Sequence, residues 1–153
     1  SLQDFVWWSG LSVSNARQAI HNIQNELVTD KFAGNELFVH RSCGEKRKSN
    51  GHVLHFLPSF DEYLISYKDR TSVLDLEHHP KAFTKNGIFH PVIIYDGKVV
   101  GTWKKTVKKG LPDVEAAFFE QIDATKEQTE LAANKYKAFL INQISLASGH
   151  VEK

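Results

Sequence analysis

The sequence predicts a mixed α+β fold, with helices at both ends and antiparallel strands between them. Two short helical patterns flank the turn Ser9-Gly10-Leu11-Ser12 near the start. The dipeptide Asp96-Gly97, which favours a two-residue hairpin turn, lies inside a mainly β pattern that begins at Val53. An amphipathic helical pattern then runs from Thr125 to about Ile144.

The first 40 residues have the pattern of a helix-turn-helix followed by a hairpin. Ser1 and Ser12 are each placed to cap a helix. Short β-type runs on both sides of Gly34-Asn35 predict two wing strands. Apolar residues at helical spacing predict a shared core, made of Phe5, Leu11, Ala16, Ile20 and Ile23.

In such a module the second helix enters the major groove of DNA. That helix is poor in lysine and arginine, so a scaffold role also stays open. The polar residues near its start are Ser14, Asn15, Arg17 and Gln18.

The region after Val53 predicts a strand, a short helix and a hairpin. Val53 to Leu57 has the composition of a buried strand, and Ser59 with Glu62 has the form of a capping box. A helix starting there places Tyr63, Tyr67 and Arg70 on one face, with Phe60 and Leu64 toward the core.

Pairing outward from Asp96-Gly97 predicts the register of the hairpin. It sets Tyr95 opposite Lys98, Ile94 opposite Val99, Ile93 opposite Val100, Val92 opposite Gly101, Pro91 opposite Thr102 and His90 opposite Trp103. Residues 114–120 suit a further strand, and Thr125 with Gln128 can cap the last helix.

The charge is distributed unevenly along the chain, although the net charge is only +1. Residues 1–40 carry −2, residues 41–110 carry +6 and residues 111–153 carry −3. A basic middle between acidic ends is typical of a phosphate-binding surface, and equally of a solvated lysine-rich surface.

The sequence motifs of several site classes are absent. We find no P-loop, nucleophile elbow or dinucleotide fingerprint, and no cysteine, histidine and carboxylate set with zinc spacing. We therefore expect no cofactor, no metal and no catalytic residue in this chain. The single Cys43 suits a reducing cytoplasm, and no apolar run is long enough for a bilayer.

The candidate DNA-binding residues form two groups. One group can orient a sugar-phosphate backbone or stack a base, and includes Tyr63, Tyr67, Asp69 and Arg70. The other is a ribbon that tracks phosphates, and includes His90, Trp103, Lys104, Lys105 and Lys108. A structural Asp69–Arg70 ion pair and core packing of His90 and Trp103 are the alternatives.

Four stretches of the sequence resemble the C-terminal half of the AlkZ-like winged-helix DNA glycosylases. They are Asp4-Phe5-x-Trp7-Trp8-Ser9-Gly10-Leu11, the residues from Phe60 to Arg70, and Gly87-Ile88-Phe89-x-Pro91-Val92 with Asp96-Gly97-x-Val99-Val100-Gly101-Thr102-Trp103-Lys104. The resemblance implies a winged-helix remnant over residues 1–42. It also implies a small antiparallel β-barrel with a C-terminal helix over residues 43–150.

The implied activity is excision of alkylated or crosslinked bases from duplex DNA by a monofunctional DNA glycosylase. In this family catalysis is attributed to a Gln-apolar-Gln or Gln-apolar-Asp motif in the N-terminal part. Gln121-Ile122-Asp123 matches the second form, but it lies near the C-terminus, so we do not take it as catalytic. Because the chain starts at Ser1 and has no methionine, we expect a C-terminal piece that is inactive alone. A non-enzymatic DNA-binding regulator and a barrel that binds protein or a small ligand remain alternatives.

Overall fold

The computed structural model describes residues 1–153 except 33, 44–51, 109–110, 125 and 149–153. The chain divides into two compact units. Unit 1 comprises Ser1–Asn50 and Glu62–Arg70, and unit 2 comprises Gly51–Asp61 and Thr71–Lys153. None of the helices in the described part of the chain has the length and apolar character needed to cross a membrane.

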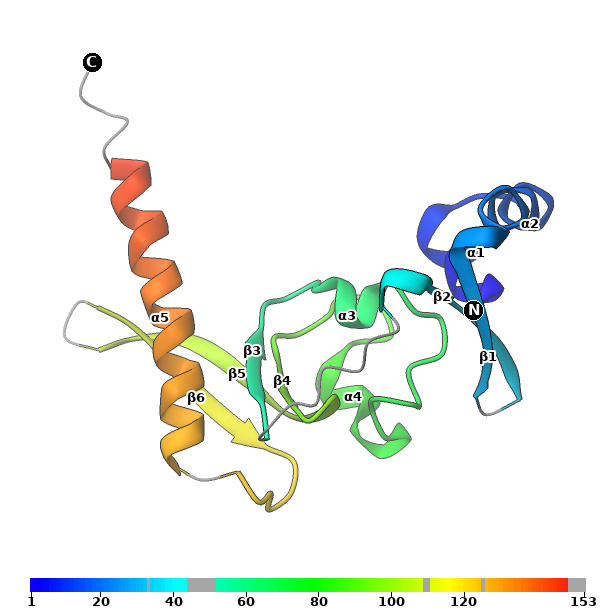
Figure 1. Ribbon diagram of the computed structural model, residues 1–153. Helices are drawn as coiled ribbons and strands as arrows, with labels where there is room; N and C mark the ends of the chain where they lie inside the picture. The colour runs from blue at the N-terminus through cyan, green and yellow to red at the C-terminus, as the bar shows by residue number, and fades with distance from the viewer. Residues whose placement is uncertain (33, 44–51, 109–110, 125, 149–153) are drawn as a thin grey trace. The chain divides into compact units, whose positions relative to one another are not determined.

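Unit 1 consists of two helices followed by a hairpin, together with a short helix from later in the chain (Figure 1). Its elements are α1 (Leu2–Ser9), α2 (Val13–Asn22), β1 (Leu27–Phe32), β2 (Asn35–His40) and α3 (Glu62–Ile65). The 3₁₀ turns Gln24–Glu26 and Arg41–Cys43 flank the hairpin.

The predicted caps of the first two helices are confirmed. Ser1 and Asp4 form a capping box at the start of α1, and the Ser12 hydroxyl accepts from the Asn15 amide at 3.2 Å at the start of α2. Gly10 ends α1 in the left-handed conformation, with φ 69°, which allows the tight turn between the helices.

The core of unit 1 is small. Of the five residues predicted to form it, Ala16 is fully buried, whereas Leu11 and Ile23 are 37% and 45% exposed. The hairpin strands β1 and β2 are six residues each, with Leu27 paired to His40 and Phe32 to Asn35. They are longer than the sequence pattern indicated.

The helix predicted from Ser59 is shorter than expected and begins later. It spans only Glu62–Ile65, so Ser59 does not cap it, and Tyr67 and Arg70 lie beyond its end. Phe60 adopts a φ of 57° and is 54% exposed rather than packed inward, whereas Leu64 is 2% exposed as predicted. The single helical face of Tyr63, Tyr67 and Arg70 is therefore wrong.

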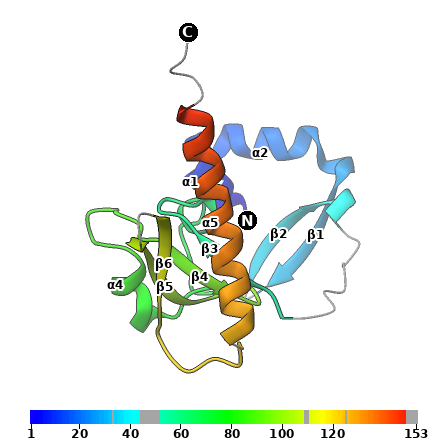
Figure 2. The same ribbon diagram turned by 90° about the vertical axis from the view of Figure 1, so that its left-hand side faces the viewer.

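Unit 2 is an open antiparallel sheet with a long helix on one face (Figures 1 and 2). Its strands are β3 (Leu54–Leu57), β4 (Val92–Tyr95), β5 (Lys98–Lys108) and β6 (Leu111–Phe118), in that order across the sheet. The helices are α4 (His79–Ala82), preceded by the 3₁₀ turn Leu76–His78, and α5 (Lys126–Ser148). Among the described strands nothing joins β3 to β6, so the predicted closed barrel is not present.

The core of unit 2 lies between the sheet and α5. It contains Leu54, Phe56, Ile93, Trp103, Ala132 and Ala133. The amphipathic pattern of the last helix predicts an apolar face made of Ala132, Tyr136, Phe139 and Leu140. Ala132 and Tyr136 pack in the core as predicted, whereas Phe139 is 55% exposed. The predicted cap at Thr125 lies outside the described residues.

The hairpin turn at Asp96-Gly97 is confirmed, since both residues have positive φ, at 48° and 81°. Tyr95 pairs with Lys98 and Ile94 with Val99 as predicted. Beyond that point the register shifts by one residue.

A β-bulge at Val100 causes the shift: Ile93 pairs with Gly101 and Val92 with Thr102. The Trp103 amide donates to Pro91 rather than lying opposite His90. The extra residue Val100 moves Gly101 opposite Ile93, and Gly101 fits closely against β6, where a Cβ would lie 2.5 Å from the Ala117 carbonyl oxygen.

Candidate nucleic-acid interface

The predicted site residues divide between the two units. Tyr63, Tyr67, Asp69 and Arg70 belong to unit 1, and His90, Trp103, Lys104, Lys105 and Lys108 belong to unit 2. Each group is therefore considered within its own unit, and a single surface built from both stays a prediction.

Arg70 follows Tyr63 and Tyr67 in the chain and folds back to hydrogen-bond the backbone of the same segment. Its Nε donates to the Leu64 carbonyl at 2.6 Å and its Nη1 to the Lys68 carbonyl at 3.2 Å. The last carbonyls of a helix have no partner within it, so the guanidinium caps the C-terminus of α3. Burial lowers the pKa of Arg70 from its ordinary value. Part of the guanidinium is therefore engaged in structural hydrogen bonds to the backbone rather than available to a phosphate.

Trp7 caps the same helix end from α1. The Trp7 indole donates to the Ile65 carbonyl at 3.0 Å, which ties the later segment to the first helix of unit 1. The sequence did not indicate this role for Trp7. The adjacent pair Trp7-Trp8 in a short helix was the available signal, since one face of so short a helix cannot bury both rings.

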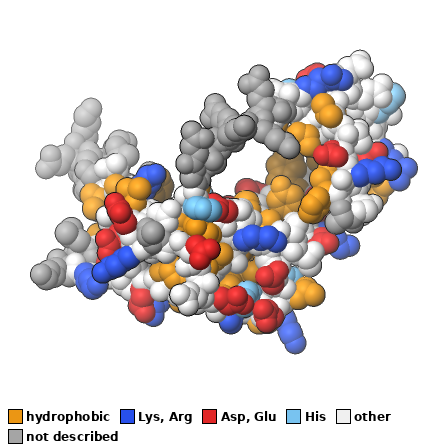
Figure 3. Space-filling model, turned by 60° about the horizontal axis from the view of Figure 1, so that its bottom comes forward, with side chains coloured by type: hydrophobic (Ala, Val, Ile, Leu, Met, Phe, Trp, Pro, Cys, Tyr) orange, Lys and Arg blue, Asp and Glu red, His pale blue; other side chains and the backbone are white. Residues whose placement is uncertain are grey.

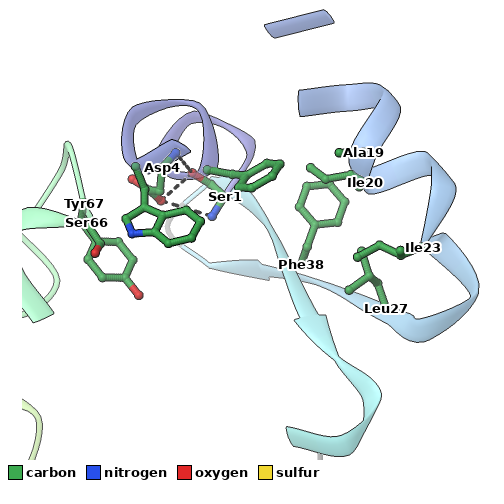
Figure 4. Close-up of a pocket in the computed structure, with 11 residues that line it drawn as sticks. Ser1, Asp4, Ala19, Ile20, Ile23, Leu27, Phe38, Ser66 and Tyr67 are labelled. Carbon is green, nitrogen blue, oxygen red and sulfur yellow. Dashed lines mark hydrogen bonds and ion pairs between the residues drawn. The ribbon is translucent and has the colours of Figure 1, made fainter. Parts of the chain in front are cut away.

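Tyr67 lines a cavity of 440 Å³ within unit 1 (Figure 4). Its walls are mainly apolar, from α1, α2 and the hairpin, with polar atoms from Ser1, Asp4 and Ser66. Tyr67 is 46% exposed and Trp8, also in the lining, is 61% exposed. Tyr63 is half-buried, and burial raises the pKa of its hydroxyl. Exposed rings such as those of Tyr67 and Trp8 can stack on a base.

The start of α2 presents the polar side chains that the sequence indicated. Ser14, Asn15, Arg17 and Gln18 are all exposed. Gln18 donates from Nε2 to the Asn22 side chain at 2.9 Å, so one of these groups has a partner on its own helix. Arg17 is the sole lysine or arginine in α2.

Trp103 is a core residue of unit 2. It is 5% exposed, its indole donates to the Leu57 carbonyl at 2.8 Å, and its ring lies 4.5 Å from that of Tyr136. His90 is half-buried and its amide donates to the Ala82 carbonyl at 2.8 Å. Trp103 therefore offers no face for stacking on DNA in this conformation.

Two of the three ribbon lysines form ion pairs with carboxylates of β6. Lys104 lies 3.2 Å from Glu115, and Lys108 lies 3.2 Å from Asp113. Lys105 is exposed and takes part in none of the ion pairs found among the described residues. Among the described lysines of this ribbon, Lys105 is therefore the one whose charge is not shared with a carboxylate.

Asp113 joins the ribbon to α5. Its carboxylate lies 2.5 Å from Lys137 Nζ as well as near Lys108. The hydrogen bond from Lys137, the Val114 amide and Lys108 together lower the pKa of Asp113 from 3.8 to about 2. The sequence did not indicate this cluster, because Lys137 and Asp113 lie on different elements.

Acidic and basic side chains are interspersed over the face of the molecule shown in Figure 3. In unit 2 the pairs described above alternate along the ribbon in the same way. A polyanion approaching this ribbon therefore meets single exposed cations rather than a uniform positive field.

Comparison with known proteins points to one family. The family described as "DNA glycosylase AlkZ-like" matches residues 1–139. Among solved structures, the DNA glycosylase AlkZ of Streptomyces sahachiroi superposes with a TM-score of 0.67 at 24% identity, covering 87% of this chain. This chain spans 37% of that protein. A search of curated proteins finds no match.

Proposed function

This chain belongs to the AlkZ-like DNA glycosylase family, and we propose that it is the DNA-binding and scaffold part of a glycosylase acting on alkylated or crosslinked bases. The observation that carries the proposal is the family match over residues 1–139, because it includes both units up to the middle of α5. We assign no catalytic residue to this chain. The catalytic glutamine motif is proposed to lie upstream of Ser1.

Unit 1 is proposed to be the end of a winged helix. Its two helices joined by the turn at Gly10 and followed by the β1–β2 hairpin support this assignment. Trp8 and Tyr67 supply exposed rings there, and Arg17 supplies a cation at the start of α2.

Unit 2 is proposed to contact phosphates through the β5–β6 ribbon. Lys105 is the principal contact, because the charges of Lys104 and Lys108 are shared with Glu115 and Asp113. Trp103 is left out of the proposed interface, because it packs in the core.

The lysine contact is tested by two matched charge reversals in unit 2. Lys105→Glu removes the proposed contact, whereas Lys135→Glu makes the same charge change on the exposed side of α5. One phosphate contact contributes about tenfold to affinity at 0.1 M salt. Fluorescence anisotropy with a random-sequence duplex should therefore show about tenfold weaker binding for Lys105→Glu and a smaller change for Lys135→Glu. Equal effects of the two variants would remove Lys105 from the interface.

The assignment of catalysis to a part of the protein outside this chain is tested by an assay of base release. The chain is incubated with a duplex that carries one alkylated purine, and free base is measured by chromatography. We expect binding without release, since the chemistry is assigned to polypeptide upstream of Ser1. Release by this chain alone would contradict that assignment.

A sequence-reading regulator is the second candidate, and the exposed polar start of α2 favours it. Selection from a random duplex library separates the two candidates. A glycosylase part should recover no consensus sequence, whereas a regulator should recover one that is lost in Asn15→Ala.

A further inference from the structure

Unit 2 contains a second group of chemically active side chains, away from the ribbon lysines. His78, at the end of the 3₁₀ turn before α4, directs its Nε2 toward two carboxylates. The distances are 3.5 Å to Glu120 Oε1 and 3.8 Å to Glu77 Oε1. We propose that His78, Glu77 and Glu120 bind a divalent transition-metal ion of the Zn²⁺ class.

The histidine is held in place by burial. His78 is 8% exposed, and its Nδ1 has no hydrogen-bond partner among the described residues. The Phe119 ring packs against the imidazole, with the two ring centroids 4.4 Å apart. Glu120 follows Phe119 directly, so the same contact brings its carboxylate to the histidine.

The spacing of the donor atoms suits a small cation. Zn²⁺ binds nitrogen and carboxylate oxygen at about 2.0–2.2 Å in tetrahedral geometry, which places neighbouring ligand atoms roughly 3.3–3.6 Å apart. The observed 3.5 and 3.8 Å are close to this, and all three ligand atoms lie within 4.8 Å of one another. Small movements of two exposed glutamates complete the site.

The donor set selects the class of metal. One imidazole nitrogen with two carboxylates suits Zn²⁺ or Co²⁺, whereas Ca²⁺ and Mg²⁺ prefer sites made only of oxygen. Three protein ligands leave a fourth position for water. The competing interpretation is an ion pair between a protonated His78 and the two carboxylates, without a metal.

The two carboxylates allow a test that leaves the buried histidine intact. Their side chains are 71% and 70% exposed, so Glu77→Gln and Glu120→Gln remove a ligand with little risk to folding. Glu130→Gln on α5, whose side chain is 64% exposed, is the matched control.

Metal-stripped, untagged protein is titrated with Zn²⁺ by calorimetry, and its Tm is measured with Zn²⁺, Mg²⁺ and Ca²⁺. We expect one Zn²⁺ site and a Tm rise with Zn²⁺ alone. Binding should weaken by at least about 10-fold in Glu77→Gln and Glu120→Gln, since losing a ligand costs no less than losing an outer-shell partner, and should be unchanged in Glu130→Gln. Absence of Zn²⁺ binding, or affinity unchanged in either ligand variant, would overturn the site. An equal Tm rise with Ca²⁺ or Mg²⁺ would overturn the assignment of nitrogen ligation.

Discussion

Replacing Trp103 tests whether this residue supports the fold or touches DNA, the two roles that its sequence context suggested. The side chain is 5% exposed and packs against Phe56 and Tyr136, with ring centroids 5.9 and 4.5 Å away. Truncation of such a buried aromatic residue costs about 3–5 kcal/mol of unfolding free energy. Trp103→Ala is therefore expected to lose most of the stability of unit 2.

A milder variant isolates the indole hydrogen bond. Trp103→Phe keeps an aromatic ring near Tyr136 but removes the donor to the Leu57 carbonyl, which lies 2.8 Å from Nε1. A carbonyl left without its partner in this partly buried place costs about 1–3 kcal/mol. Trp8→Ala, at an indole that is 61% exposed, should cost less than about 1 kcal/mol and serves as the control.

The assay is urea denaturation followed by far-UV circular dichroism, because tryptophan fluorescence itself changes in all three variants. Duplex DNA affinity is measured in parallel on Trp103→Phe under conditions in which it is folded. We expect lower stability and unchanged affinity. A loss below about 1 kcal/mol in Trp103→Ala, or a loss of affinity without a loss of stability, would refute the core assignment.

The remaining predictions concern the same sheet. Gly101→Ala places a methyl group 2.5 Å from the Ala117 carbonyl oxygen, so thermal or urea unfolding should show a loss of about 1–3 kcal/mol; wild-type stability would refute the close approach. Asp113 has a pKa of about 2, below its ordinary 3.8, because Lys137 stabilises the carboxylate. Its contribution to stability is thus present above about pH 4 and is lost as the pH falls through about 2. Asp113→Asn should flatten the acid limb of a plot of unfolding midpoint against pH, and an unchanged limb would assign the effect to other groups.

Local signals in the sequence predicted several elements correctly. Asp96-Gly97 predicted the turn because a two-residue hairpin turn needs positive φ at both positions, and aspartate followed by glycine adopts this conformation readily. Ser1 and Ser12 predicted the starts of α1 and α2 because a hydroxyl satisfies amides that a helix leaves unpaired. These features depend on neighbours within four residues.

Features that depend on distant segments were not predictable in this way. The register beyond Ile94 was wrong because Val100 is an extra, bulged residue, and the pairing of two adjacent strands does not show in the sequence of either one. The short α3 depends on Trp7 and Arg70, which satisfy its last carbonyls from outside the helix. The closed barrel was wrong because nothing joins the edge strands β3 and β6 among the described strands, and α5 covers one face of the open sheet instead.

The residue types of the candidate interface were visible in the sequence, but their ion-pair partners on β6 were not. The sequence grouped Trp103 with Lys104 in one ribbon, whereas the structure buries Trp103 and exposes Lys104. Pairing with β6 then places Glu115 opposite Lys104, and that neutralising partner becomes visible only once the register of the two strands is known.

The salt dependence of duplex binding tests the central claim most directly. A random-sequence duplex is titrated with this chain over a series of salt concentrations, and the logarithm of the association constant is plotted against the logarithm of salt. One to three lysine contacts from the ribbon predict a slope between about −1 and −3, made shallower by about 1 in Lys105→Glu. Absence of binding, or an affinity that does not change with salt, would contradict the assignment of this chain as the DNA-binding part of a glycosylase.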